Sequence, residues 1–422
     1  MLLQFSVENF KSFKNKTILS LEASTDSEHK NNYSLIGKDK CLKVISMFGA
    51  NAAGKSNIFQ ALTVSILLVR NSNQRQIGEV MTSIVPYKFD EKAQNSPTSF
   101  EFVFIVDATK YVYGFSVTQH KIITEYLYVY KTAKASVIFE RDENKEEIYK
   151  FTNPKLKKEL LPLTKMNTEN KLFLATATAW NCEETRIPFT WFQTSINVYT
   201  SNYRNFNKIG YMLENDSDHS LHYFIHKVLK EADVNIHDFE FESRELKKEQ
   251  LPENMQEIFS QNTNFNLKQF KINTTHQIKK ADGNIEYHSL NINQESIGTQ
   301  NLFYMSPIIK QAFDTGETIC IDEFDNSLHP MIVLYLIRLF NNSEINKANA
   351  QLVISTHTMD LLDLKILRRD QIYFVEKNNN TGISELYSLD EFSPRTREDI
   401  RKAYLLGRYG SIPNVQDGDI CD

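Results

Sequence analysis

"SMFGANAAGKSN" (residues 46–57) is the stretch of sequence that decides the fold. Gly49 and Gly54 are followed by Lys55 and Ser56, which fits the pattern G-x-x-x-x-G-K-[ST] of loops that bind nucleotide phosphates. Glycine lets such a loop turn tightly and aim backbone N–H groups at phosphate oxygens, while the helix that follows adds the positive end of its dipole. The predicted phosphate-binding residues, called the phosphate loop below, are Gly49, Ala50, Asn51, Ala52, Ala53, Gly54, Lys55, Ser56 and Asn57.

The sequence on both sides of this loop supports the prediction. Residues 41–49 alternate between apolar and polar side chains, as do 2–10 and 17–23, so the chain opens with strands and the third of them runs into the loop. From Ser56 onward, apolar residues recur at helical spacing. Strand, loop and helix is the context that a phosphate loop requires.

Two apolar strands later in the chain end in polar side chains. Residues 318–326 are predicted to be a buried strand that ends with Asp322 and Glu323. Residues 350–358 are predicted to be a second such strand, and it delivers His357 to the same edge of the sheet. The three polar side chains are therefore expected beside the phosphate loop.

The middle of the chain has a different character. Residues 98–131 are rich in Phe, Tyr, Val and Ile and are predicted to form an antiparallel meander. A helix is predicted over 218–234, and a hairpin over 270–292 that turns at Asp282 and Gly283. After residue 294 an α/β pattern returns, with a helix over 331–342 and a strand over 371–377. The predicted domains are a split nucleotide-binding core (1–80 and 294–385), an inserted β-rich meander with a helical lid region (81–293) and a C-terminal helical tail (386–422).

Composition and charge narrow the class of protein. No stretch approaches the roughly 20 apolar residues that span a bilayer, and the start lacks the pattern of a signal peptide, so we expect a cytoplasmic protein with no membrane partner. The formal net charge of −5 gives no global basic field for nonspecific nucleic-acid binding. The scattered cysteines Cys41, Cys182, Cys320 and Cys421 predict neither a disulfide framework nor a zinc site.

The motifs predict roles in phosphate chemistry. Lys55 would reach the β and γ phosphates, and the Ser56 hydroxyl would ligate Mg²⁺. Asp322 would hold the same ion through water, and Glu323 would act as general base on the attacking water. His357 would donate a hydrogen bond to the γ phosphate. The simpler alternatives are solvated acids at the end of a strand and a structural histidine.

A polar turn over 293–303 opens a further predicted helix, with Glu295 and Ser296 as capping residues and Gly298 two positions later. The turn lies between the inserted region and the acidic strand.

Taken together, these motifs occur in the order found in ABC-type ATPase heads, the group that includes Rad50, SMC, RecF and the OLD proteins. More particularly, the chain resembles the AAA15 family of small prokaryotic ATPases, many of which are linked to abortive infection and phage defence. The phrases that carry the resemblance are "FSVENFKSFK", "GANAAGKSN", "ESIGTQNLF", "DTGETICIDEFDNSLHP", "STHT" and "YLLGRYGSIPNV".

The resemblance implies an α/β fold, namely an ABC-type P-loop NTPase head in which helices flank a mixed sheet, with a large α+β insertion between the phosphate loop and the signature motif. Ser296 and Gly298 occupy the signature position, which in such heads contacts the γ phosphate of nucleotide bound to the opposite subunit. Residues 325–328 fall where the D-loop lies, and His357 is the switch histidine. ATP and Mg²⁺ are the implied cofactors, and a homodimer or higher homo-oligomer would form around the nucleotide.

The implied function is an ATPase that senses infection or controls a separate nuclease or toxin effector, with nucleic acid or a phage component as trigger. Two alternatives remain at this stage. One is a DNA-repair ATPase of RecF type, and the other is a nuclease of OLD type, although the chain after His357 is too short for the nuclease domain that OLD proteins carry.

Three features depart from the pattern or lack an assignment. Ile297 and Thr299 stand in the signature, where transporters have L-S-G-G-Q. Gln74 and Gln76 are the candidates for the Q-loop glutamine. The tail arginines would contact a partner protein, nucleic acid or solvent, and they are Arg395, Arg397, Arg401 and Arg408.

Overall fold

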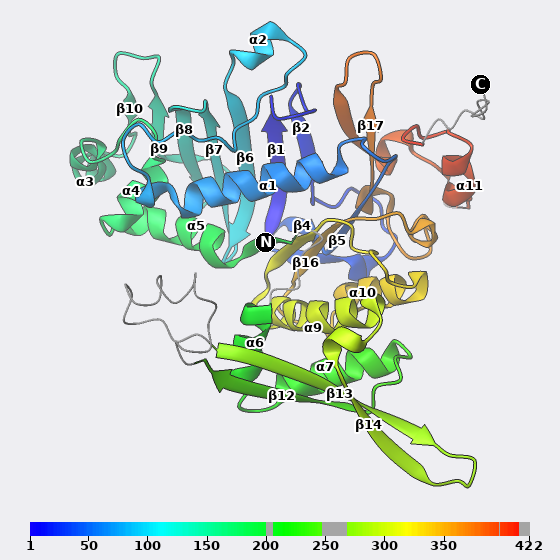
Figure 1. The fold of residues 1–422 in the computed structure, drawn as a ribbon. Helices are drawn as coiled ribbons and strands as arrows, with labels where there is room; N and C mark the ends of the chain where they lie inside the picture. Colours follow the sequence, from blue (N-terminus) through cyan, green and yellow to red (C-terminus); the bar gives the residue numbers. More distant parts are fainter. Residues whose placement is uncertain (200–205, 247–267, 396, 413–422) are drawn as a thin grey trace, which may run out of the picture. The chain divides into compact units, whose positions relative to one another are not determined.

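The computed structural model of the chain describes residues 1–199, 206–246, 268–395 and 397–412. It divides into two compact units (Figure 1). Unit 1 comprises Met1–Ser201, Ala312–Phe324 and Leu336–Asp422, and unit 2 comprises Asn202–Gln311 and Asp325–Tyr335.

The helices and strands are as follows. In the first half of the chain they are β1 (Leu2–Glu8), β2 (Thr17–Ser20), β3 (Tyr33–Ile36), β4 (Asp39–Leu42), β5 (Val44–Phe48), α1 (Lys55–Arg70), α2 (Glu91–Gln94), β6 (Thr98–Val106), β7 (Thr109–Val117), β8 (Ile122–Tyr130), β9 (Ser136–Asp142), β10 (Tyr149–Lys150), α3 (Pro154–Thr164), α4 (Phe173–Ala179), α5 (Glu183–Thr194) and β11 (Ile196–Tyr199). In the second half they are α6 (Phe206–Glu214), α7 (Ser220–Glu231), β12 (Asp238–Glu245), β13 (Lys268–Lys279), β14 (Ile285–Asn291), α9 (Ile297–Thr315), β15 (Thr318–Ile321), α10 (Pro330–Asn341), β16 (Gln351–Ser355), β17 (Ile372–Lys377), β18 (Ser384–Ser388) and α11 (Ile400–Leu405).

A six-stranded mixed sheet in unit 1 positions the phosphate loop. Its order is β11-β15-β16-β5-β17-β18, and every neighbouring pair is parallel except β17 and β18. β5, β15 and β16 are fully buried apolar strands, as expected where both faces of a parallel sheet are covered. Because parallel strands end at the same edge, the loop after β5 and the residues after β15 and β16 meet there. The predicted α/β class is confirmed.

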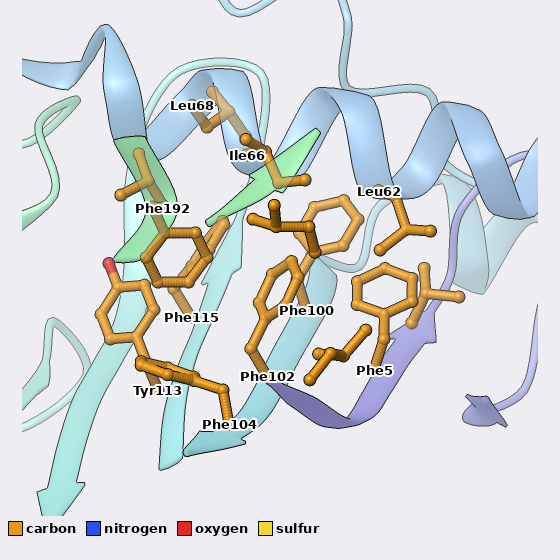
Figure 2. Packing of buried hydrophobic residues seen from close by; sticks show 14 of the residues in the cluster. Phe5, Leu62, Ile66, Leu68, Phe100, Phe102, Phe104, Tyr113, Phe115 and Phe192 are labelled. Atoms are coloured by element: carbon orange, nitrogen blue, oxygen red, sulfur yellow. The ribbon is translucent and has the colours of Figure 1, made fainter. Parts of the chain in front are cut away.

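A second, seven-stranded antiparallel sheet has the order β10-β9-β8-β7-β6-β1-β2. Helix α1 runs across one face of this sheet (Figure 1), and Figure 2 shows the aromatic side chains that fill the space between them. Phe5 of β1 and Phe102 of β6 lie with ring centroids 4.9 Å apart, and Phe102 meets Phe192 of α5 edge to face at 5.0 Å. This packing fixes the helix that follows the phosphate loop.

The meander of residues 98–131 is confirmed as β6, β7 and β8, but its place in the fold differs from the prediction. β6 pairs with β1 along its length, with Phe102 opposite Phe5, so the meander belongs to the same sheet as the first strand. The compact unit therefore continues to residue 201 instead of ending near residue 80. The reason is that β1 is hydrogen bonded on both edges, to β2 and to β6.

The strand predicted over 41–49 is two strands. β4 pairs with β3 in a small separate sheet, and β5 lies in the six-stranded sheet. Between them lies Lys43, whose N–H donates to the carbonyl of Asn32 at 2.9 Å.

Unit 2 contains a three-stranded antiparallel sheet, β12-β13-β14, together with α6, α7 and the first part of α9. The hairpin predicted over 270–292 is confirmed as β13 and β14, and Gly283 takes a left-handed φ of 88° in its turn. The predicted helix over 218–234 is α7, which buries Leu221, Ile225, Val228 and Leu229.

The described part of the C-terminal region is less helical than predicted. It contains β18, the six-residue helix α11 and a turn that packs through aromatic rings. Tyr404 and Tyr409 stack on Phe374 of β17, with ring centroids 5.3 and 5.6 Å away. Residues 413–422 lie outside the described part. Among the described residues, no helix has the length and apolar character needed to cross a membrane.

Candidate functional site

The phosphate loop connects β5 to α1 in unit 1, as predicted. Three of its residues take left-handed backbone conformations, with φ of 153° at Gly49, 61° at Ala52 and 118° at Gly54. Such a run of unusual dihedrals curls the backbone around a small concavity in which N–H groups converge. Helix α1 begins at Lys55, so the last three residues of the phosphate loop form its first turn.

Both glycines are favoured by close neighbouring atoms as well as by φ, backbone atoms at Gly49 and serine side chains at Gly54. A Cβ at Gly49 would lie 2.3 Å from the carbonyl oxygen of Val375 in β17. At Gly54 it would lie 2.5 Å from Oγ of Ser384 and 3.0 Å from Oγ of Ser12. The loop is thus pressed against β17 at one end and against β18 and the β1–β2 connection at the other.

The Lys55 ammonium lies inside the loop. Its Nζ donates to the carbonyl oxygens of Gly49 at 2.6 Å and of Ala50 at 3.2 Å. The side chain is buried, with 8% of its surface exposed. The charge is therefore already held at the place where phosphate oxygens would lie.

The acids after β15 are tied to β16 by Ser355. Its Oγ donates to Oδ1 of Asp322 at 2.5 Å and accepts from the backbone N–H of Glu323 at 2.7 Å. Glu323 has a φ of 53°, a strained conformation for a residue other than glycine, and its carboxylate is exposed. The serine hydroxyl thus holds the carboxylate of Asp322 and the backbone of Glu323 in place.

A cleft of about 1310 Å³ opens beside the phosphate loop. Gly49 and residues 50–53 line it, and so does the exposed His357, which follows β16. Other parts of its wall come from Lys14, Tyr87, Phe89 and Asp90, from the turn between β17 and β18, and from the C-terminal segment. The phosphate loop and His357 share this cleft, whereas Lys55, Ser56, Asp322 and Glu323 are not among the described residues that line it. The two acids follow β15, which is separated from β5 by β16 in the same sheet.

Two further serines support the loop and were not singled out from the sequence. Ser12 Oγ accepts from Nδ2 of Asn57 at 2.7 Å, and Ser384 Oγ donates to the carbonyl of Ala53 at 2.6 Å. Ser12 lies in the stretch "FSVENFKSFK", which is one of those that carry the family resemblance, but the resemblance assigns no role to Ser12 itself. No sequence pattern marked Ser384, which follows a polar turn.

The signature residues belong to unit 2. Ser296 Oγ accepts from the N–H of Thr299 at 3.2 Å and so caps the first turn of α9. A Cβ at Gly298 would lie 2.5 Å from the carbonyl oxygen of Ser327, so the start of α9 touches the predicted D-loop. Glu295 accepts hydrogen bonds from Thr274 and from His276 of β13, the latter at 2.7 Å.

The structure gives no added support to the two Q-loop candidates or to a partner-binding role of the tail arginines. Gln74 ends a short 3-10 helix just beyond α1, whose 16 residues run about 24 Å away from the phosphate loop, and neither it nor Gln76 lines the cleft. In the tail, Arg401 donates to Asp360 at 2.9 Å and Arg408 to Glu398 at 2.6 Å. Both arginines therefore pair within the chain, on an exposed surface.

The donor set fits Mg²⁺. Hydroxyl and carboxylate oxygens are ligands that this ion accepts, and Ser56 and Asp322 supply one of each, Ser56 just after β5 and Asp322 at the end of β15, two strands away in the same sheet.

Comparison with known proteins agrees with this geometry. The family described as "AAA domain, putative AbiEii toxin, Type IV TA system" matches residues 44–163 and 184–363, well over half of the chain. The chain belongs to this family. The match to this AAA-domain family starts at β5, runs through the phosphate loop and continues past the acidic strand and His357.

Solved structures with some likeness include the SMC head domain from Thermotoga maritima, with a TM-score of 0.39 and 12% identity over 92% of this chain and 98% of that one. Another is the Smc head domain bound to the C-terminal domain of ScpA, derived from Pyrococcus furiosus (TM-score 0.39, 14% identity, 93% and 97% covered). A third is cbiO1 from Clostridium perfringens, part of the ABC transporter complex cbiONQ (TM-score 0.31, 12% identity, 97% and 98% covered). No curated protein sequence matches the chain.

Proposed function

We propose that this AAA-domain protein is an ABC-type ATPase that binds and hydrolyses ATP, dimerises around the nucleotide, and controls a separate effector in an antiphage system. One observation carries the ATPase part. The phosphate loop, the two carboxylates and His357 stand at the ends of adjacent parallel strands, and Ser355 links the acid-bearing strand to the strand that carries His357.

In the proposed reaction, the loop N–H groups and Lys55 bind the β and γ phosphates, and the α1 dipole favours their negative charge. Ser56, and Asp322 through water, would hold Mg²⁺, and the ion would supply neutralisation of the charge on the phosphates. Glu323 orients the attacking water and accepts its proton. His357 donates a hydrogen bond to the γ phosphate.

The dimer is proposed from the start of α9. Ser296 and Gly298 lie at the capped N-terminus of a 19-residue helix, where backbone N–H groups and the dipole favour an anion such as a γ phosphate. Ile297, between them, is 57% exposed and available to a second subunit. The resemblance to ABC-type heads assigns that anion to nucleotide bound by the partner.

Control of a separate effector is proposed from the family description, which names a toxin and a type IV toxin–antitoxin system, and from the similarity to AAA15 proteins. Nucleic acid or a phage component is the proposed trigger.

The experiment uses two variants of the full chain. Lys55→Ala should abolish ATP binding, and Glu323→Gln should bind ATP yet hydrolyse it slowly, so that it accumulates the nucleotide-bound dimer. Glu323→Gln expressed with its neighbouring genes should retain the effector on purification, and Lys55→Ala should not. Unchanged ATP binding by Lys55→Ala would overturn the ATPase assignment. Absence of any associated protein, together with unchanged phage sensitivity when the neighbouring genes are deleted, would overturn the effector role.

A further inference from the structure

The cleft beside the phosphate loop extends well beyond the phosphates. One end is fixed by Gly49 and the loop, and His357 marks the side where the γ phosphate would lie. The base of a bound nucleotide must then occupy a different part of the cleft. Another stretch of its wall is formed by Tyr87, Phe89 and Asp90 and by the turn between β17 and β18, residues 378–383.

Phe89 offers an aromatic surface in that stretch. Its side chain is 76% exposed although it is large and apolar, and it lines the cleft. The ring is held in place from two sides. It meets Tyr87 edge to face at 5.7 Å, and a Cβ at Gly382 would lie only 2.9 Å from its Cε2, so the ring rests against the turn.

The support beneath this ring is firm. Tyr87 is 2% exposed, and its hydroxyl donates to the carbonyl of Thr381. The backbone N–H of Tyr87 donates to Oδ1 of Asn9 at 3.0 Å. Within the turn, Asn378 Oδ1 accepts from the N–H groups of Asn380 and Thr381, both at 3.0 Å. An exposed aromatic ring on a rigid base is the arrangement that proteins use to stack a nucleobase.

The same turn presents amide side chains. Asn379 and Asn380 are exposed and line the cleft. A carboxamide carries a donor and an acceptor side by side, which matches the N6–H and N7 of adenine. Guanine offers two acceptors on that edge, O6 and N7, so one carboxamide cannot pair with both.

We propose that Phe89 is the stacking platform for the nucleotide base and that Asn379 and Asn380 make this subsite favour adenine over guanine. The inference rests on the proposed binding of a nucleoside triphosphate at the phosphate loop. It assigns residues to the base of that nucleotide, which the loop does not contact.

The first test measures dissociation constants of the full chain for Mg·ATP, Mg·GTP and inorganic triphosphate. Phe89→Ala should weaken ATP binding about 10-fold and leave triphosphate binding unchanged, and Phe89→Trp should restore ATP binding. Trp180→Ala is the matched control, because Trp180 is 58% exposed in the same unit and does not line the cleft. ATP binding by Phe89→Ala as tight as that of the wild type would overturn the platform.

The second test uses the double variant Asn379→Ala with Asn380→Ala. The ratio of the GTP and ATP dissociation constants should fall about 10-fold, with triphosphate binding unchanged as evidence that the turn still folds. An unchanged ratio would overturn the role of the amides. If the wild type bound neither triphosphate nor ATP, the proposed ATPase function itself would fail, and this inference with it.

Discussion

Ser355 Oγ lies 2.5 Å from Oδ1 of Asp322, so the last residue of β16 holds the acid that follows β15. The two strands are parallel neighbours, and Ile321 and Ile354 are opposite each other in their register. The next residue on each strand is therefore brought to the same level at the edge of the sheet. A buried carboxylate needs such a partner, because an unpaired one would be costly to bury.

Replacing Ser355 with alanine should slow hydrolysis more than it weakens binding. Loss of the hydroxyl frees both Asp322 and the N–H of Glu323, and misplacement of a general base is expected to lower kcat about 10- to 100-fold. The free energy of unfolding should fall by about 1–3 kcal/mol because a buried acceptor loses its donor. Steady-state ATPase assays and urea titrations measure both. Ser65→Ala is the control, since that hydroxyl is equally buried but donates only to carbonyls of its own helix.

Alanine at Gly49 or Gly54 should abolish nucleotide binding. Each added Cβ would meet a backbone or serine oxygen at 2.3 or 2.5 Å, and each residue has a positive φ. Gly78 also has a positive φ, 80°, but a Cβ there meets nothing within 4 Å. Gly78→Ala should therefore carry only the strain of the left-handed conformation, about 1–3 kcal/mol, and keep full ATP affinity. Equal ATP affinity in all three variants, with Gly49→Ala still folded, would contradict the close-packing argument.

The contrast between these residues shows what sequence could and could not predict. The spacing of Gly49, Gly54 and Lys55 predicts a phosphate loop because the motif is local to nine consecutive residues. The location of Asp322 and His357 at one edge of the sheet was predictable, since each follows an apolar strand and parallel strands end at one edge. Ser355, Ser12 and Ser384 were not, because their roles depend on which strand lies beside which. That neighbour relationship is set by packing and leaves no mark in local periodicity.

The same reasoning explains the misplaced meander. Alternation over residues 98–131 correctly predicted strands, yet alternation does not say which strand they pair with. The partner of β6 is β1, about 100 residues earlier in the chain, and the aromatic rings of Phe5 and Phe102 pack on each other only after that pairing. In the described part of the tail, the contacts of Tyr404 and Tyr409 with Phe374 of β17 likewise depend on a strand that local periodicity does not identify as their partner.

The three cysteines in the described part of the chain should be unreactive in the folded protein. Cys41, Cys182 and Cys320 are buried, and burial raises the pKa of each thiol, to about 11 for Cys41. The thiolate is the reactive form, so at pH 8 these residues should resist an aromatic disulfide reagent. In a Cys421→Ser background, native protein should show no labelling and denatured protein should label at all three positions. Rapid native labelling would contradict the burial.

Ser296→Ala tests the proposed dimer in a way that separates it from binding. The hydroxyl caps α9, and its loss should cost about 1 kcal/mol of stability while also removing a group proposed to meet the partner's nucleotide. In the Glu323→Gln background, ATP affinity should stay within about 2-fold of the parent, because a change this small is under 0.5 kcal/mol, whereas ATP-dependent dimers should disappear in sedimentation experiments. Asn153→Ala is the matched control, since Asn153 caps α3 by accepting from Lys155 and Leu156 and no role in the dimer is proposed for it. If both variants lost dimers equally, the effect would be one of stability; if neither did, Ser296 would not lie at the interface.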